Sequence, residues 1–250
     1  MQIKSIGEVI SVLDEIVAES ALNNNTLGYF AVLYQKVTVK VKEGIENRYF
    51  DDGKRMEKLD IVFAKRYIDA YYAWKQNASV SKSWEKAFET AEDKKILVLQ
   101  HLLLGMNAHI NLDLGIAAAA ISTNENIREL KNDFDKINEI LSSMVDEVQH
   151  GLSAIWPALK IILSMLNKTG NYLIDFSMEV ARDGAWNFAT IIDQHTSEER
   201  PGLIQARDLK VAEKSKIITR PGKWIQFLLW LIRLGERGSV SQKIDKLKKF

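Results

Sequence analysis

Residues 101–120 are the part of this chain that most restricts its fold. The segment, HLLLGMNAHINLDLGIAAAA, is too apolar to face water on any side of a helix, so we expect other elements to bury it. It nevertheless contains two histidines, two asparagines and one aspartate. Burying such side chains costs free energy unless each finds a partner. The segment therefore predicts a central helix with a polar site inside the protein.

Apolar residues recur at spacings of three and four along most of the chain, which is typical of amphipathic helices. Only 13 glycines and 3 prolines interrupt them, so the helices are expected to be long. Short connections favour antiparallel neighbours, and we predict an all-α fold, a single compact bundle of about eight to ten helices. The predicted helices span 5–20, Thr26 to Val41, 54–76, the residues around Trp84 and Phe88, Asp93 to Ser122, Thr123 to Gly151, Pro157 to Leu166, Tyr172 to Ile191, 203–219 and a C-terminal stretch.

The composition, with 46% hydrophobic and 27% charged residues among 250, is that of a globular protein. We assign residues 1–250 to one helical domain, because no linker, repeat or low-complexity tract divides them. The net charge of +1 argues against nucleic-acid binding. There is no cysteine, no signal-peptide core and no uninterrupted apolar run as long as a membrane span. These features lead us to expect a cytoplasmic protein.

His109 and Asp113 are the first candidates for function. They are four residues apart, so their side chains lie side by side on one helical face. The pair can supply two metal ligands, with His101 two turns away as a third and zinc, iron or manganese as suitable ions. Without a metal, His109 can act as a general base that Asp113 orients. The pair can also be purely structural, a buried hydrogen bond that fixes the helix.

Asn107 and Asn111 lie on the nearly opposite face of the same helix. They are candidates for substrate binding, or they bridge neighbouring helices. Any further metal ligand must come from another helix. Asp60 is the first candidate for this role, and His150 with Asp146 is the second.

The predicted helix over 54–76 carries many aromatic residues. Asp60 shares a face with Phe63 and Tyr67, so it is the carboxylate most expected to point inward, where it can take part in catalysis. Arg66 and Tyr67 are candidate substrate contacts in an aromatic-lined pocket. The alternative is a core stripe with solvated charges on its back.

Two other groups have weaker patterns. Arg182 and Trp186 are four apart, and an arginine beside an aromatic ring can hold an anionic group or simply stack on the ring. Asp51 and Asp52 with Glu57 resemble the magnesium-binding motif of helical isoprenoid synthases, although Asp-Asp-Gly is also a common turn before a helix.

The C-terminal tail, residues 222–250, is distinct because it is both rich in tryptophan and basic. An amphipathic helix of this kind can lie on a membrane surface. It can also dock on its own bundle or on a second subunit of a homo-oligomer, and docking is the interpretation that we favour.

Four stretches carry a family resemblance: 56–67 (MEKLDIVFAKRY), 101–114 (HLLLGMNAHINLDL), 182–186 (RDGAW) and 207–212 (RDLKVA). They resemble an uncharacterised microbial family, known only as a domain of unknown function. The resemblance implies an all-helical fold and no particular reaction. The spacing of His109 and Asp113 is also similar to the His-x-x-x-Asp helix of zinc-dependent phospholipases C, whose other signatures are absent here.

Together these features predict a small-molecule enzyme with a buried site around His109 and Asp113. The aromatic helix implies an apolar or amphipathic substrate. Hydrolysis or proton transfer, with or without a divalent metal, is the expected chemistry. The alternative is a non-catalytic helical bundle that binds a lipid-like ligand or a protein partner.

Overall fold

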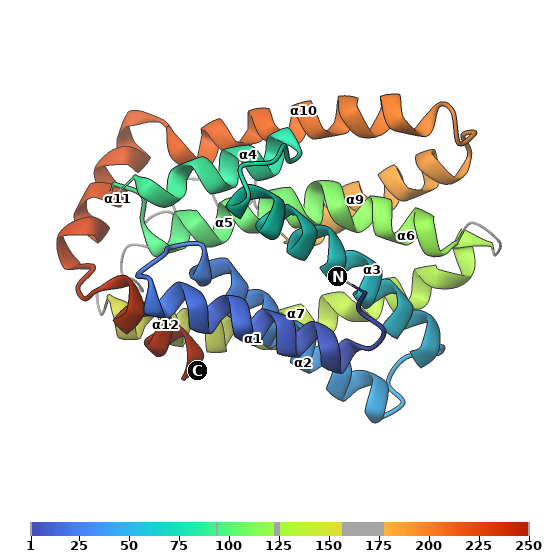
Figure 1. Cartoon of the computed structure of the whole chain (residues 1–250), viewed down its shortest axis with the longest axis horizontal. Helices are drawn as coiled ribbons and strands as arrows, with labels where there is room; N and C mark the ends of the chain where they lie inside the picture. Colours follow the sequence, from blue (N-terminus) through green and yellow to red (C-terminus); the bar gives the residue numbers. More distant parts are fainter. Residues whose placement is uncertain (1, 94, 123–125, 157–177, 250) are drawn as a thin grey trace.

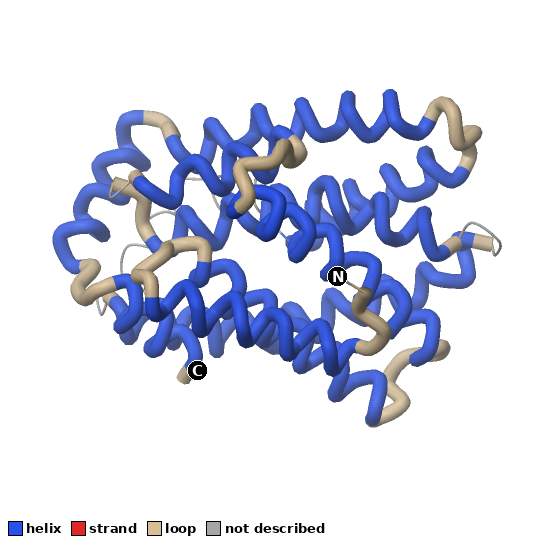
Figure 2. Tube along the Cα trace, viewed as in Figure 1, coloured by secondary structure: helices blue, strands red, loops and turns tan. Residues whose placement is uncertain are grey.

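The computed structural model describes residues 2–93, 95–122, 126–156 and 178–249, apart from the side chains at 142, 145–154, 178 and 179. Over these residues the chain forms no β-strand, and short loops join its helices (Figure 2). The all-α prediction is confirmed. The α-helices are α1 (Ile6–Leu22), α2 (Gly28–Glu46), α3 (Gly53–Lys75), α4 (Lys82–Glu89), α5 (Val98–Ala108), α6 (Gly115–Ile121), α7 (Lys131–Ile155), α9 (Met178–Asp193), α10 (Arg200–Thr219), α11 (Lys223–Gly235) and α12 (Val240–Lys248).

One continuous helical segment, Val98–Ile121, runs through the middle of the bundle (Figure 1). Its first part, α5, packs against α2, α4 and α10, and its last part, α6, packs against α3 and α9. The sequence predicts no membrane span here, yet by length and composition the segment could cross a bilayer. In the structure 89% of its most apolar stretch is buried within the protein, as expected for a central core helix.

Between α5 and α6 the segment forms a π-helix, η2 (His109–Leu114). Such segments are rare and are frequent at functional sites. The apolar residues before η2 belong to one core cluster, shared with α1 to α4, and those from Leu112 onward belong to a second cluster, shared with α7 and α9. His109 and Asp113 therefore lie at the junction of the two clusters.

Two carboxylates fix the start of α3, the aromatic-rich helix. Asp52 accepts a hydrogen bond from the backbone N–H of Arg55 at 3.0 Å. The buried Asp133 of α7 accepts hydrogen bonds from the backbone N–H groups of Asp51 and Asp52, at 2.6 and 2.9 Å. Because the first N–H groups of a helix have no intrahelical partners, these bonds stabilise its start.

Most predicted helices exist, and several of their boundaries were wrong. The central helix begins at Val98 rather than Asp93, because a 3₁₀ turn, η1 (Thr90–Glu92), and a loop precede it. Helix α7 continues to Ile155, past the predicted end at Gly151, since a glycine costs a helix only about 1 kcal/mol. The C-terminal stretch forms two helices, separated at Gly238, whose φ of 103° suits only glycine.

The remaining predictions about helices have mixed outcomes. Residues Val37–Val41, the end of the helix predicted from Thr26, are helical within α2, although their β-branched side chains would also suit a strand. The predicted cap Thr123 and the predicted helix from Pro157 to Leu166 lie outside the described residues.

Candidate functional site

His109 and Asp113 form a buried pair in η2. His109 Nδ1 lies 3.2 Å from Asp113 Oδ2, and the two side chains are 2% and 0% exposed. The spacing of four residues therefore brings the side chains together on this π-helical turn, as it does on an α-helix.

Two donors from other helices hold Asp113. Trp84 of α4 donates its indole N–H to Oδ2 at 2.8 Å, and Arg66 of α3 donates its Nε–H to Oδ1 at 2.7 Å. The Arg66 side chain is 33% exposed, so its charge reaches from the buried carboxylate to the protein surface. Both oxygens of Asp113 are thus hydrogen-bonded, and the network joins α3, α4 and η2.

This network sets the charges of the pair. Burial alone would raise the pKa of Asp113, but the hydrogen bond with His109 and the charge of Arg66 outweigh it and hold the pKa below its usual range. Burial lowers the pKa of the His109 imidazole, and Asp113 offsets this only in part. At neutral pH His109 is therefore neutral, and its Nδ1–H donates to the Asp113 carboxylate. The other nitrogen, Nε2, carries no proton and is an acceptor.

Aromatic rings surround the imidazole, and we call them the aromatic cage. Phe63 stacks on His109 with ring centroids 3.6 Å apart and an angle of 7° between the rings. Tyr34 meets the imidazole edge-on, at 4.4 Å and 77°. The other members of the cage, at 5.8 to 6.1 Å, are Phe30, Tyr67 and Trp84.

Four polar atoms in and beside the cage are buried and have no hydrogen-bond partner among the described residues: His109 Nε2, the hydroxyls of Tyr34 and Tyr67, and Asp60 Oδ2. A buried polar group without a partner costs about 1–3 kcal/mol, and such groups are few in folded proteins. Three of the four belong to the imidazole and to rings beside it, and Asp60 lies near enough to Tyr34 to affect its pKa, so this region is the candidate functional site.

Three of these groups are donors at neutral pH. Burial raises the pKa of the Tyr34 and Tyr67 hydroxyls above the usual range, and at Tyr34 the negative charge of Asp60 adds to the effect. Burial, followed by the charge of Glu57, raises the pKa of Asp60 to about 8. Asp60 points inward, as predicted, and is a protonated acid at pH 7. The site therefore combines one unprotonated nitrogen with two hydroxyls and a carboxylic acid.

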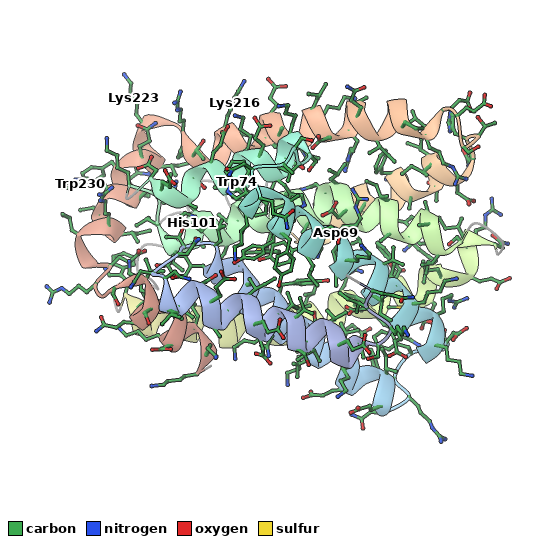
Figure 3. The ribbon with its side chains drawn as sticks, in the orientation of Figure 1. Asp69, Trp74, His101, Lys216, Lys223 and Trp230 are labelled. Atoms are coloured by element: carbon green, nitrogen blue, oxygen red, sulfur yellow. The ribbon has the colours of Figure 1, made fainter. Side chains whose placement is uncertain are left out.

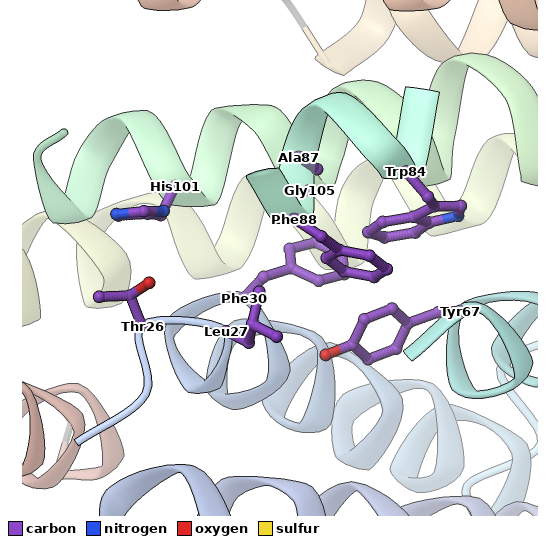
Figure 4. Close-up of a pocket in the computed structure, with 9 residues that line it drawn as sticks. All are labelled: Thr26, Leu27, Phe30, Tyr67, Trp84, Ala87, Phe88, His101 and Gly105. Atoms are coloured by element: carbon purple, nitrogen blue, oxygen red, sulfur yellow. The ribbon is translucent and has the colours of Figure 1, made fainter. Parts of the chain in front are cut away.

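A small pocket adjoins the cage (Figure 4). Its cavity volume is about 20 Å³, roughly the room that one water molecule needs. The Tyr67 hydroxyl points toward Leu27 in this pocket (Figure 4). Three cage residues, Phe30, Tyr67 and Trp84, form part of the wall, whereas His109, which their rings approach, does not line the pocket. The lining residues are Thr26, Leu27, Phe30, Tyr67, Trp84, Ala87, Phe88, His101 and Gly105.

Asn107 and Asn111 face α10. Asn107 Nδ2 donates to the backbone carbonyl of Val211 at 2.9 Å and to Ser215 Oγ at 3.2 Å. Asn111 Nδ2 donates to Asn107 Oδ1 at 3.2 Å. Asn107 therefore bridges α5 to α10 and Asn111 supports Asn107 within the central segment, which favours a structural role over substrate binding.

Arg207 and Asp208 of α10 hold the two elements that carry the network. Arg207 donates its Nε–H to the backbone carbonyl of Asn111, within η2, at 2.8 Å. Asp208 accepts hydrogen bonds from the first two backbone N–H groups of α4, at 2.6 and 2.8 Å. Asp208 thereby fixes the helix that presents Trp84 to Asp113.

The described side chains do not gather into a metal site. Among them, no group of three or more His, Cys, Asp or Glu could hold an ion. His101 lines the pocket, with its ring 5.6 Å from that of Tyr29, and burial lowers its pKa to about 4. The side chains of His150 and Asp146 lie outside the described residues. The metal-binding interpretation of His101, His109, Asp113 and His150 thus finds no support in the described part of the chain.

Arg182 and Trp186 lie elsewhere, against Phe134 of α7. Arg182 donates from Nη2 to the backbone carbonyl of Phe134 at 2.5 Å, and its guanidinium carbon lies 4.5 Å from the ring centre. The Trp186 ring lies 5.0 Å from the same ring. Both residues join α9 to α7, which favours a packing role.

The acidic group near the start of α3 also has structural partners. Asp51 pairs with Lys136 and accepts a hydrogen bond from Asn132, while Asp52 caps α3. Glu57 accepts a hydrogen bond from the backbone N–H of Ile6 at 3.2 Å. These contacts explain the three carboxylates without a magnesium-binding motif.

Sequence reasoning missed Tyr34, Trp84, Arg207 and Asp208. Tyr34 and Trp84 belong to the apolar faces of their own helices, and nothing in the local pattern indicates that they meet η2. The motif at 207–212 could have indicated Arg207 and Asp208, because they are the first two of the residues that carry the family resemblance there.

Residues 6–221 match a family of unknown function, DUF5995. No curated protein and no solved structure matches the chain. The likeness to zinc-dependent phospholipases C therefore rests on the spacing of one residue pair. The matched region runs from α1 to the end of α10 and includes every residue of the candidate site, whereas α11 and α12 follow it. Since the match covers most of its length, the chain belongs to the DUF5995 family.

Proposed function

We propose that this protein is a small-molecule enzyme in which His109 Nε2 accepts a proton from the substrate or from a water that attacks it. One observation carries the proposal: Nε2 is buried without a hydrogen-bond partner in the described part of the chain, while Nδ1 of the same ring is held by Asp113. A carboxylate that fixes the tautomer of an imidazole leaves the opposite nitrogen as a base.

The neighbouring donors suit the negative charge that such a step creates. Proton abstraction beside a carbonyl, and attack of water on an ester, both place charge on the carbonyl oxygen. The Tyr34 hydroxyl, whose ring lies 4.4 Å from His109, and the protonated Asp60 are neutral donors of the kind that stabilise this oxygen. The Tyr67 hydroxyl is a third donor, at the pocket.

The surroundings limit the substrate to a compact, largely apolar molecule. The cavity inside the pocket is only about 20 Å³, far below the roughly 300–1,000 Å³ of small-molecule sites, so a substrate has to enlarge it by moving side chains. Its walls are mostly aromatic and aliphatic. A substrate that enters it reaches Nε2 only when Phe30, Tyr67 or Trp84 moves aside, so a ring movement belongs to the proposed cycle.

Isotope incorporation tests the proposal without knowledge of the product. The purified protein is incubated with a panel of small ketones, esters and lactones in D₂O or in ¹⁸O-labelled water. Proton transfer at carbon appears as deuterium in the recovered compound, and hydrolysis appears as ¹⁸O in the released acid. We expect the wild type to be active and His109→Gln to be at least about a hundredfold less active, because a general base accelerates such reactions by that factor or more.

His195→Gln is the matched control, because His195 lies on the loop after α9 and its imidazole bonds locally, to the Ile191 carbonyl. Activity that survives in folded His109→Gln would disprove the role of Nε2.

The alternative is a non-catalytic bundle that binds a small apolar ligand. It is favoured because Phe30, Tyr67 and Trp84 line the pocket, whereas His109 does not. In that case a ligand recovered by extraction would protect the protein from thermal unfolding, and His109→Gln would leave its affinity unchanged.

A further inference from the structure

The outer face of α11 is apolar and open. Helix α11 lies at one end of the bundle (Figure 1), and Leu228, Leu229 and Ile232 bury its inner face in the protein. Its outer face presents Trp224, Phe227, Trp230 and Leu234, which are 54%, 46%, 52% and 61% exposed. Docking on the bundle, the interpretation favoured from sequence, thus accounts for one face of this helix only.

The exposed rings form a row. Trp224 stacks on Phe227 with centroids 5.8 Å apart, and Phe227 stacks on Trp230 at 6.0 Å. Trp230 points away from the ribbon at the end of the molecule, and Lys223 projects outward near it (Figure 3). Aromatic side chains of this kind favour the boundary between water and lipid.

The helix segment that carries this row has charges of one sign. Every charged residue from Lys214 to Gly235 is basic. Arg220, Lys223 and Arg233 are exposed and have no ion-pair partner among the described residues. The nearby Glu236 is engaged by Lys243 at 2.7 Å and by the backbone N–H of Val98 at 3.2 Å. The face is therefore complementary to an anionic surface.

We infer that the α11 face, made of Trp224, Phe227, Trp230 and Leu234 with Arg220, Lys223 and Arg233, binds the surface of an anionic lipid bilayer. The rings enter the interface and the basic groups contact lipid phosphates. A second copy of the chain is a poorer partner, because a symmetric dimer through this face would bring the same basic residues together. The inference is independent of the proposed chemistry at His109.

Vesicle sedimentation of the full chain tests this inference. We expect wild-type protein to bind vesicles of phosphatidylcholine with 30% phosphatidylserine, to bind pure phosphatidylcholine weakly, and to be released by salt. The triple variant Trp224→Ser, Phe227→Ser, Trp230→Ser should bind at least about tenfold more weakly. Replacing Lys223 and Arg233 by Gln should cost about fivefold for each charge.

The control variant, Val180→Ser with Leu209→Ser, removes exposed apolar side chains on α9 and α10 (60% and 56% exposed) and should bind like the wild type. The inference is overturned if wild-type protein fails to sediment with the anionic vesicles, or if it binds both compositions equally. The inference is also overturned, in favour of self-association, if the wild type binds no vesicles but forms a concentration-dependent dimer that the triple variant does not form.

Discussion

Asp113 is the residue on which the buried polar network depends. It is fully buried and accepts hydrogen bonds from His109, Trp84 and Arg66. Asp113→Ala leaves all three donors without their acceptor, so we expect a loss of about 3 kcal/mol in the free energy of unfolding, measured in urea. Asp69→Ala, which removes only an exposed pair with Lys65, should cost less than about 0.5 kcal/mol. If Asp113→Ala and Asp69→Ala lose the same free energy of unfolding, the buried network does not stabilise the protein more than an exposed ion pair does.

Asp60 predicts a specific dependence of stability on pH. Its pKa is 3.8 when unperturbed and about 8 in the folded protein. Between these values the unfolded chain releases a proton that the folded protein retains, so this group makes unfolding easier as pH rises. Asp60→Asn cannot ionise, and its free energy of unfolding relative to wild type should rise by about 1 kcal/mol per pH unit in this window. If the difference between variant and wild type does not vary with pH, the Asp60 carboxyl has the same pKa in the folded and the unfolded protein, which contradicts its burial.

The pairing of His109 with Asp113 and the inward direction of Asp60 could be predicted, because both follow from helical spacing within one element. The contacts of Asp113 with Trp84 and Arg66 could not, since they depend on which helices pack around η2. Asn107 and Asn111 were correctly placed on the opposite face, but the partners of Asn107 on α10 were not predicted, because they too depend on the packing of helices.

Close packing explains why α5 needs a glycine where it meets α2. A Cβ atom added at Gly105 would lie 2.4 Å from the ring of Phe30, a member of the aromatic cage. Gly105→Ala should therefore destabilise the protein by about 2 kcal/mol, although alanine favours helices. Gly202 of α10 has no neighbour within 4 Å, and Gly202→Ala should stabilise by about 0.5–1 kcal/mol. Thermal unfolding of both variants checks this contrast, and a stabilised Gly105→Ala would contradict the packing described here.

The π-helix is the element that the sequence pattern could not reveal. Periodicity predicts an uninterrupted α-helix through His109, because a single π-helical turn changes only the spacing of the backbone hydrogen bonds, from four residues to five. In this protein Arg207 bonds the Asn111 carbonyl in the π-helical turn, and a residue 96 positions away leaves no trace in the local pattern.

At the scale of the whole molecule, α12 belongs to the same core as the N-terminal helices. Ile244 and Leu247 are 0% and 1% exposed, in the cluster that contains α1 and α2. Ile244→Ala should cost about 2–4 kcal/mol, as for other large core residues. Ile217→Ala, at a position 43% exposed, should cost less than about 1 kcal/mol. A loss at Ile244 as small as that at Ile217 would mean that α12 unfolds separately.

The all-α bundle could be predicted because few breakers and a strong apolar period leave little alternative to helices. The order in which those helices surround Val98–Ile121 could not, because amphipathic faces do not specify their partners. The separation of the tail into α11 and α12 depends on one glycine with positive φ, a conformation that composition does not show.

The protonation state of His109 tests the central claim most directly. We propose ¹⁵N NMR of histidine-labelled protein at pH 7, with the His109 signals assigned by their loss in His109→Gln. The account predicts a neutral imidazole with the proton on Nδ1 and none on Nε2. A proton on Nε2, in either the other tautomer or an imidazolium, would contradict it, because no free base would then face the aromatic cage.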